Sequence, residues 1–174
     1  MSGMLIPPDA NHGKFLKAAG QFSQLPESIQ LEILKIVLER GNLMNMVVHG
    51  LSMYPFIRDG DRVIVKPFGD QLPQIGDIVA FQRPENGQLI MHRVIEKEGD
   101  RYTIKGDNVF TSDGSISRSK LIGQIISVTR TGRQVHAGLG YVKKFLAWLS
   151  KHNLVIFFNR TRKYFSRVLK AILG

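Results

Sequence analysis

The sequence predicts a mainly β domain that is preceded by one helix and followed by a basic helical tail. Between residues 44 and 129, short runs rich in Val and Ile alternate with Gly, Asp and Asn turns. Before them lies an apolar segment with helical spacing, and after them comes a segment that mixes aromatic and basic residues. At 174 residues the chain is long enough for a single domain with its own core. We therefore expect a flexible N-terminus (1–24), a docking helix (25–41), a β domain (42–135) and a basic amphipathic tail (136–174).

The helix is expected at residues 25–41. Pro26 suits a first turn, Glu27 favours the N-terminal dipole, and Gly41 is a stop signal. A wide apolar face at helical spacing is expected to dock on the core; it consists of Ile29, Ile33, Ile36 and Val37, with Leu31, Leu34 and Leu38 beside them.

Five or six short strands are expected in the β body. The ranges are 44–48, 63–65, 77–81, 89–95, 101–105 and 121–129. The turn at residues 83–87 contains Asn-Gly, which is typical of tight hairpins. Residues 106–118 are expected to form a loop.

The tail is basic and contains no acidic residue after Asp113. Phe145, Trp148 and Leu149 have helical spacing, and so do apolar residues from Phe165 onward, so two amphipathic helices parted near residues 152–153 are expected. Such segments lie in the interface of an anionic bilayer. Peripheral membrane contact through residues 141–173 is the favoured interpretation. Simple packing on the domain is the main alternative, and binding to nucleic acid or a partner protein is disfavoured.

Composition excludes several classes of function. With 24 Lys and Arg against 14 Asp and Glu, the formal charge is +10, which favours an anionic partner. The absence of Cys excludes disulfides, thiol nucleophiles and thiolate metal sites. Neither a secretory signal nor an apolar run of roughly 18 residues is visible. We expect a location in the cytoplasm or at the periphery of a membrane.

Three residue types that together perform nucleophilic catalysis occur at structured positions. Ser52 lies at a break in V-V-H-G-L-S-M-Y-P, which would hold its backbone and expose its hydroxyl. His92 lies within the apolar run L-I-M-H-R-V-I and is the best candidate for the base. Asp107 and Asp113 follow the next strand, and either one could orient the His92 ring. The alternatives are a loop serine, a hydrogen-bonded core histidine and turn-forming aspartates.

In this order, the motifs H-G-L-S-M-Y-P, G-D-x-V-x-V, G-D-I-V-A-F, M-H-R-V and K-G-D-N resemble those of the type I signal peptidase superfamily of serine proteases. The closest similarity is to the endoplasmic-reticulum and archaeal branch, which uses His where bacterial enzymes and self-cleaving repressors use Lys. The resemblance covers residues 47–129 and implies a signal-peptidase and self-cleaving-repressor-like β fold. It implies Ser52 as nucleophile, His92 as general base, Asp113 as third member and Asp107 as a supporting residue. No metal or organic cofactor is required.

The sequence departs from this pattern in ways that bear on function. Gly50 stands where signal peptidases carry a Ser or Thr that helps to hold the oxyanion, and Tyr54 stands where the branch often has Glu. The usual N-terminal membrane anchor is not visible. These departures favour a dedicated endopeptidase that matures a precursor or leader peptide, bound as an added strand with small residues before the cut.

Two other functions are compatible with the sequence. The first is a catalytically inactive, protease-like module whose tail binds an anionic membrane or nucleic acid. The second is a self-cleaving regulator, which is disfavoured because no Lys is visible where that class needs its base.

Overall fold

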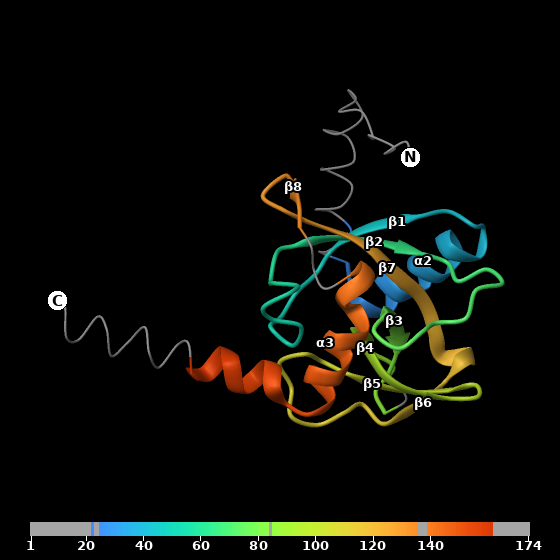
Figure 1. Ribbon diagram of the computed structural model, residues 1–174. Helices are drawn as coiled ribbons and strands as arrows, with labels where there is room; N and C mark the ends of the chain where they lie inside the picture. Colours follow the sequence, from blue (N-terminus) through green and yellow to red (C-terminus); the bar gives the residue numbers. More distant parts are fainter. Residues whose placement is uncertain (1–21, 23–24, 84, 136–138, 162–174) are drawn as a thin grey trace, which may run out of the picture.

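The computed structural model describes residue 22 and residues 25–83, 85–135 and 139–161. Within these ranges the chain forms one antiparallel eight-stranded sheet with helices before and after it (Figure 1). The strands are β1 (Met44–Val47), β2 (Arg62–Lys66), β3 (Ile78–Gln82), β4 (Leu89–Glu98), β5 (Arg101–Lys105), β6 (Ser115–Ser117), β7 (Leu121–Arg130) and β8 (Arg133–Gln134). The helices are α2 (Glu27–Glu39) and α3 (Lys143–Lys151). The predicted mainly β class is confirmed.

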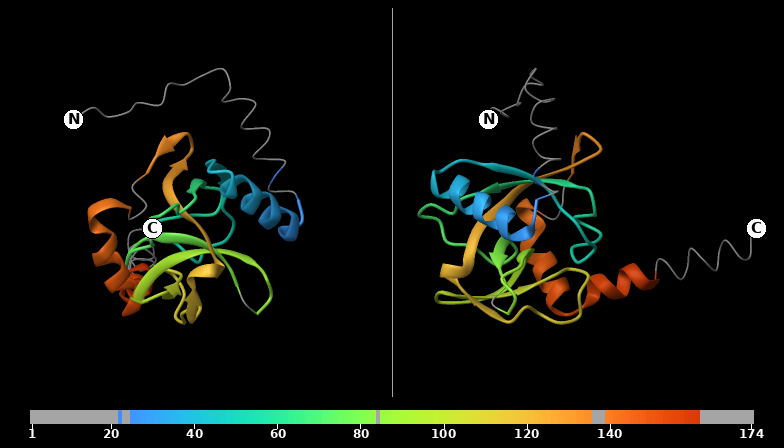
Figure 2. Two further views of the ribbon diagram at one scale, coloured as in Figure 1. Left: turned by 90° about the vertical axis from the view of Figure 1, so that its right-hand side faces the viewer. Right: turned by 180° about the vertical axis from the view of Figure 1, so that it is seen from behind.

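The strand order is β1-β2-β7-β3-β4-β5-β6, and β8 pairs with β7. The long strand β7 therefore lies between β2 and β3 and joins the two halves of the sheet. Register shifts at Ile64/Val65, Ala80/Phe81 and Val94/Glu96 interrupt three of the ladders. Because bulges bend and twist strands, these shifts account for the strong curvature visible in Figure 2.

The curved sheet encloses two apolar clusters rather than one. The first joins α2 to β1, β2 and β7 and includes Leu34, Val63 and Val128, which are fully buried. The second lies among β3, β4, β5 and β6 and centres on Phe81, Tyr102 and Ile104. Each half of the sheet thus has its own core.

The helix packs on the core through one part of the wide apolar face that the sequence predicts. The buried residues of α2 are Leu31, Leu34 and Leu38, whereas Ile29 and Ile36 are 41% and 45% exposed. Both sets have helical spacing, so periodicity alone could not choose between them. The choice depends on the direction from which β1 and β7 approach the helix.

Two short strands lie in segments where no strand was predicted. β6 is a three-residue strand that pairs with β5, inside the expected loop at 106–118. β8 consists of two residues that pair with the end of β7. Such short segments carry too little alternation to be recognised.

The tail contains α3 and a further helical stretch at residues 154–161, separated by turn residues 152–153. In Figure 1, α3 lies against the sheet, and the stretch that follows it extends away from the body of the domain. Most of the second predicted tail helix, and the N-terminal segment predicted to be flexible, lie outside the described residues. Among the described helices, none is both long and apolar enough to span a membrane.

Candidate active site

Ser52 lies in a loop between β1 and β2 that is closed by backbone hydrogen bonds. Val48 N donates to Asp61 O, and Gly60 N donates to Val48 O, both at 2.9 Å. Gly50 adopts a φ of +97°, which favours glycine, and its N–H donates to Asp59 Oδ1 at 2.9 Å. The D-G-D turn that follows Ser52 therefore fixes the entry and the exit of the loop that carries it.

Arg130 at the end of β7 secures the same loop from outside. It donates to Asp61 from Nε at 2.9 Å and from Nη2 at 2.7 Å, and Nη2 also donates to Phe56 O. Burial opposes ionisation of Asp61, but hydrogen bonds from Arg130 and from Arg58 N hold the pKa of this carboxyl below its ordinary value. The sequence analysis did not identify Arg130, which lies 69 residues from its partner.

His92 lies on β4 and is 4% exposed. Its Nδ1 is 2.6 Å from Oδ2 of Asp113, a short contact of the kind that charged groups form. This contact occupies one ring nitrogen and leaves Nε2 on the opposite side of the ring. A carboxylate held at Nδ1 fixes the tautomer in which Nε2 can accept a proton.

Asp113 is held from a second side by Arg83, which lies at the end of the β3–β4 hairpin. Arg83 Nη2 donates to Asp113 Oδ1 at 2.6 Å, so both carboxylate oxygens are engaged. Burial alone would raise the pKa of Asp113, but the hydrogen bonds and charges of His92 and Arg83 outweigh it and lower the pKa below its ordinary 3.8. Sequence reasoning treated Arg83 only as part of a turn.

Asp107, the other carboxylate candidate, makes a different contact. It forms a fully buried ion pair with Arg93, whose Nη2 donates to Asp107 Oδ2 at 2.8 Å. Arg93 Nη1 also donates to Gly76 O, and the guanidinium lies 5.6 Å from the centre of the Phe56 ring. Asp107 therefore supports the loops around the site through Arg93, while His92 pairs with Asp113.

The residue after Asp107 holds the backbone of the serine loop. Asn108 N donates to Ser52 O at 2.7 Å, and Asn108 Nδ2 donates to Leu51 O at 3.1 Å. Gly106, in the same K-G-D-N motif, has no room for a side chain. A Cβ there would come within 2.9 Å of both His92 Nε2 and Ser52 O. Three segments distant in sequence thus converge at Gly106.

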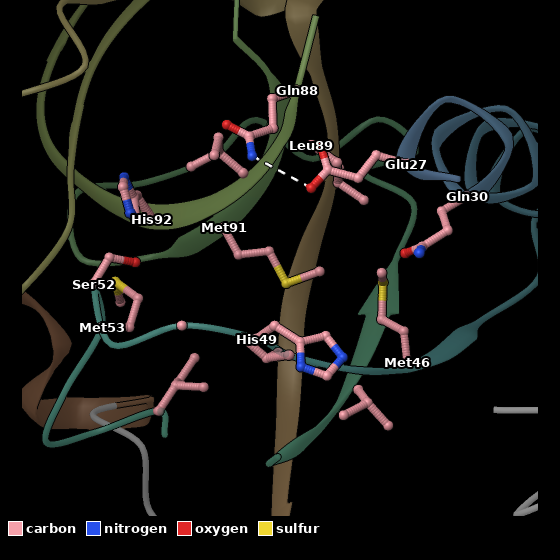
Figure 3. Close-up of a pocket in the computed structure, with 15 residues that line it drawn as sticks. Glu27, Gln30, Met46, His49, Ser52, Met53, Gln88, Leu89, Met91 and His92 are labelled. Atoms are coloured by element: carbon pink, nitrogen blue, oxygen red, sulfur yellow. Dashed lines mark hydrogen bonds between the residues drawn. The ribbon is translucent and has the colours of Figure 1, made fainter. Parts of the chain in front are cut away.

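Ser52 and His92 line one cavity of about 180 Å³. Figure 3 shows the Ser52 side chain beside the His92 ring, with Met53 next to Ser52 and Met91 extending the wall toward Met46. The Ser52 hydroxyl forms no hydrogen bond to another residue in the described part of the chain. Catalytic contacts of this kind often tighten only when substrate binds.

The cavity lies between two stretches of backbone, residues 46–50 and 88–92. Among the described strands, β1 pairs only with β2, and β4 does not pair with β5 until Arg93. Each stretch therefore has an edge without a strand partner in the described ranges. An extended peptide between them could form main-chain hydrogen bonds to such an edge.

The backbone also offers a donor for a developing oxyanion. Ser52 N–H has no acceptor among the described residues, whereas Gly50 N–H is already bonded to Asp59. Within the same ranges, no group of three or more His, Asp or Glu side chains is placed to hold a metal ion.

More than half of the chain matches a known protein family. A family model described as Peptidase S24-like matches residues 13–126. The chain belongs to the Peptidase S24-like family. This family lies in the superfamily that contains signal peptidases and self-cleaving repressors. A search of the curated proteins found no match.

The Peptidase S24-like match includes all four candidate residues, Ser52, His92, Asp107 and Asp113, and ends before α3. Membership at this level suggests a peptidase or a self-cleaving regulator. The basic tail is therefore an addition to the part of the chain that the family model covers.

Proposed function

We propose that this protein is a serine endopeptidase of the Ser-His-Asp type that matures a precursor or leader peptide, related to the endoplasmic-reticulum and archaeal signal peptidases. The observation that carries the proposal is the 2.6 Å contact between His92 Nδ1 and Asp113 Oδ2, which leaves Nε2 on the side where Ser52 lies. Buried His–carboxylate pairs beside a serine are the arrangement that activates a hydroxyl.

The mechanism follows from these positions. Ser52 Oγ attacks the scissile carbonyl while His92 Nε2 takes its proton, and Asp113 stabilises the imidazolium that forms. The Ser52 N–H donates to the oxyanion. His92 then gives the proton to the leaving amine, and in the second half of the reaction it activates the water that hydrolyses the acyl-enzyme.

The substrate class follows from the cavity. A peptide that lies between residues 46–50 and 88–92 would be extended, and its side chains would meet Met46, Met53 and Met91. Methionine side chains adapt to apolar groups of different shape. We therefore propose that small, apolar residues precede the cut.

An active-site probe tests this function directly. A fluorophosphonate should label the wild-type chain at Ser52, and Ser52→Ala should abolish labelling. His92→Ala should slow labelling by at least about a hundredfold, because the loss of a general base removes that much rate. His152→Ala is the matched control, since this exposed histidine lies at the end of α3, in contact with Trp148. Equal labelling of wild type and Ser52→Ala would refute the proposal.

Mass spectrometry of the wild-type protein distinguishes this function from self-cleavage. Intact mass measured after prolonged incubation should remain that of the full chain. If the chain is cut within itself, and this cut is absent from Ser52→Ala, then the function is self-cleavage and not precursor processing.

A further inference from the structure

The outer side of α3 carries a stripe of aromatic rings. Phe145 and Trp148 lie three residues apart on one side of α3, Tyr141 lies in the turn just before the helix, and His152 lies just after it. Tyr141 is fully exposed, and Phe145 and Trp148 are 59% and 52% exposed. The rings of Phe145 and Trp148 stack with their centres 6.2 Å apart, and His152 is 5.0 Å from Trp148. We call these four residues the α3 stripe.

The opposite side of α3 is firmly attached to the sheet, so the exposure of the stripe does not reflect an undocked helix. Lys105 Nζ donates to Ser150 O at 2.6 Å, and Lys143 Nζ lies 2.6 Å from Asp77 Oδ1. Gly76 packs so closely that a Cβ there would lie 2.5 Å from the Lys143 backbone. The fold therefore directs one side of α3 inward and presents the stripe to the surroundings.

The charges around the stripe favour an anionic partner. Lys144 lies beside the stripe and forms no ion pair within the described residues, whereas Lys151, one turn beyond Trp148, is paired with Glu96. No acidic residue follows Asp113, and two carboxylates of the β domain that contact α3, Asp77 and Glu96, are each paired with one of its lysines. Exposed Phe157 and Phe158 add apolar surface just after α3. Aromatic rings with flanking lysines are the side-chain combination that binds the interface of an anionic bilayer.

We propose that the α3 stripe docks on an anionic lipid bilayer, with the rings of Phe145 and Trp148 inserted at the level of the headgroups. The helical stretch after α3 also reaches the loops of the candidate site: Asn159 Nδ2 donates to Tyr54 O at 3.4 Å, and Arg160 lies over the Phe110 ring at 5.1 Å. Figures 1 and 2 show this stretch leaving the domain beside those loops. Docking would thus hold the Ser52 site next to the membrane surface, a consequence that rests on the proposed function.

The chain contains a reporter for this contact, because Trp148 is its only tryptophan. The full-length Ser52→Ala protein should show a blue shift of Trp148 emission when mixed with vesicles containing about one third phosphatidylglycerol, and it should sediment with them. Phosphatidylcholine vesicles should bind at least about tenfold more weakly, and salt near 0.5 M should weaken binding to the anionic vesicles. Because Ser52→Ala has no nucleophile, the result does not depend on the proposed protease activity.

Matched variants locate the contact. Phe145→Ser should weaken vesicle binding by about tenfold or more, because a large ring is lost from the interface. Leu43→Ser, which removes an apolar side chain that is 55% exposed at the start of β1, should have no effect. Lys144→Glu should weaken binding to anionic vesicles, whereas Lys120→Glu, at an exposed position outside the tail, should not.

Four results would overturn the proposal. These are an emission spectrum that anionic vesicles leave unchanged, equal binding by Phe145→Ser, a shift that depends on protein concentration without lipid, and a shift with duplex DNA alone. The third result would indicate that a second copy covers the stripe, and the fourth would indicate a nucleic-acid site.

Discussion

At the scale of single residues, Asp113 is placed to orient His92, and Arg83 is placed to hold Asp113. The two carboxylate oxygens have separate partners, so the position of the carboxylate does not depend on His92 alone. A base is effective only while its ring keeps the orientation that faces the nucleophile. We therefore propose that Arg83 is a positioning residue, two contacts removed from His92.

Arg83→Ala should lower kcat/KM by about tenfold, since a hydrogen bond to a charged group is worth about 1.5–3 kcal/mol and Arg83 is partly exposed. Arg83→Lys should recover part of the loss, because it restores the charge without the planar fork. The comparison is Arg101→Ala, an exposed arginine that bonds to Ser115 on the far edge of the sheet. Equal losses in both alanine variants would contradict the positioning role.

Asp113 also makes stability depend on pH. Because His92 and Arg83 outweigh the effect of burial, the pKa of Asp113 is lower in the folded state than its ordinary 3.8. The unfolded chain therefore binds more protons than the folded chain as pH falls below about 4. The stabilisation is fully present above that pH and is lost as pH falls through the folded pKa.

The free energy of unfolding of wild type should therefore exceed that of Asp113→Asn by more at pH 6 than at pH 3. Urea titrations at the two pH values measure the difference. A gap that stays constant, or that widens in acid, would show that Asp113 is not stabilised as a carboxylate.

At the scale of elements, the site depends on how closely the K-G-D-N loop approaches the serine loop and β4. Asn108 N donates to the Ser52 carbonyl. At Gly106 there is room only for a hydrogen atom between this loop, the Ser52 carbonyl and the His92 ring. A side chain at this point would push apart the two loops and the His92 ring. The conformation of Gly106 is not the reason for a glycine here, because its φ lies outside the range that other residues avoid.

Gly106→Ala should reduce kcat by at least about tenfold in protein that remains folded, because displacement of catalytic groups by about 1 Å can cost a hundredfold. Gly123→Ala is the matched control: a Cβ there would lie within 2.8 Å of Leu38 and Val65 in the core, away from the site. It should lower the melting temperature without changing kcat per folded molecule. Unchanged kcat in Gly106→Ala would show that the loop has room to move.

At the scale of the whole molecule, a buried ion pair beside the second cluster also reaches Phe56, which packs against the first. Arg93 on β4 and Asp107 after β5 are both inaccessible to solvent, and Arg93 also reaches Gly76 and the Phe56 ring. Removing one member of such a pair leaves a buried charge without compensation. The pair therefore contributes to the stability of the domain and not only to the local loop.

Asp107→Asn should lower the free energy of unfolding by about 3–5 kcal/mol, as measured by chemical denaturation. Glu96→Gln removes one member of an exposed pair with Lys151, in which both side chains are 45% exposed, and should cost less than about 1 kcal/mol. Similar losses in the two variants would mean that the Arg93–Asp107 pair has no special role.

The sequence alone determined the class of fold and most of the strands. The β5 range was predicted without error at 101–105, and β7 and β3 were within one residue, because alternation and Gly, Asp or Asn turns are local signals. The four candidate residues were also named from motifs, and all of them lie close to one another in the structure. Their catalytic roles remain proposals.

Only the tertiary structure decided which groups meet. Sequence spacing left Asp107 and Asp113 equally able to reach His92; the folded chain gives Asp113 to His92 and Asp107 to Arg93. It also adds Arg83 and Arg130 to the loops of the site, and within the apolar face of α2 it buries Leu31, Leu34 and Leu38 while Ile29 and Ile36 stay exposed. Local patterns specify backbone conformation over a few residues. Contacts between side chains 20 to 70 positions apart depend on how the strands pair and curve, which no local pattern records.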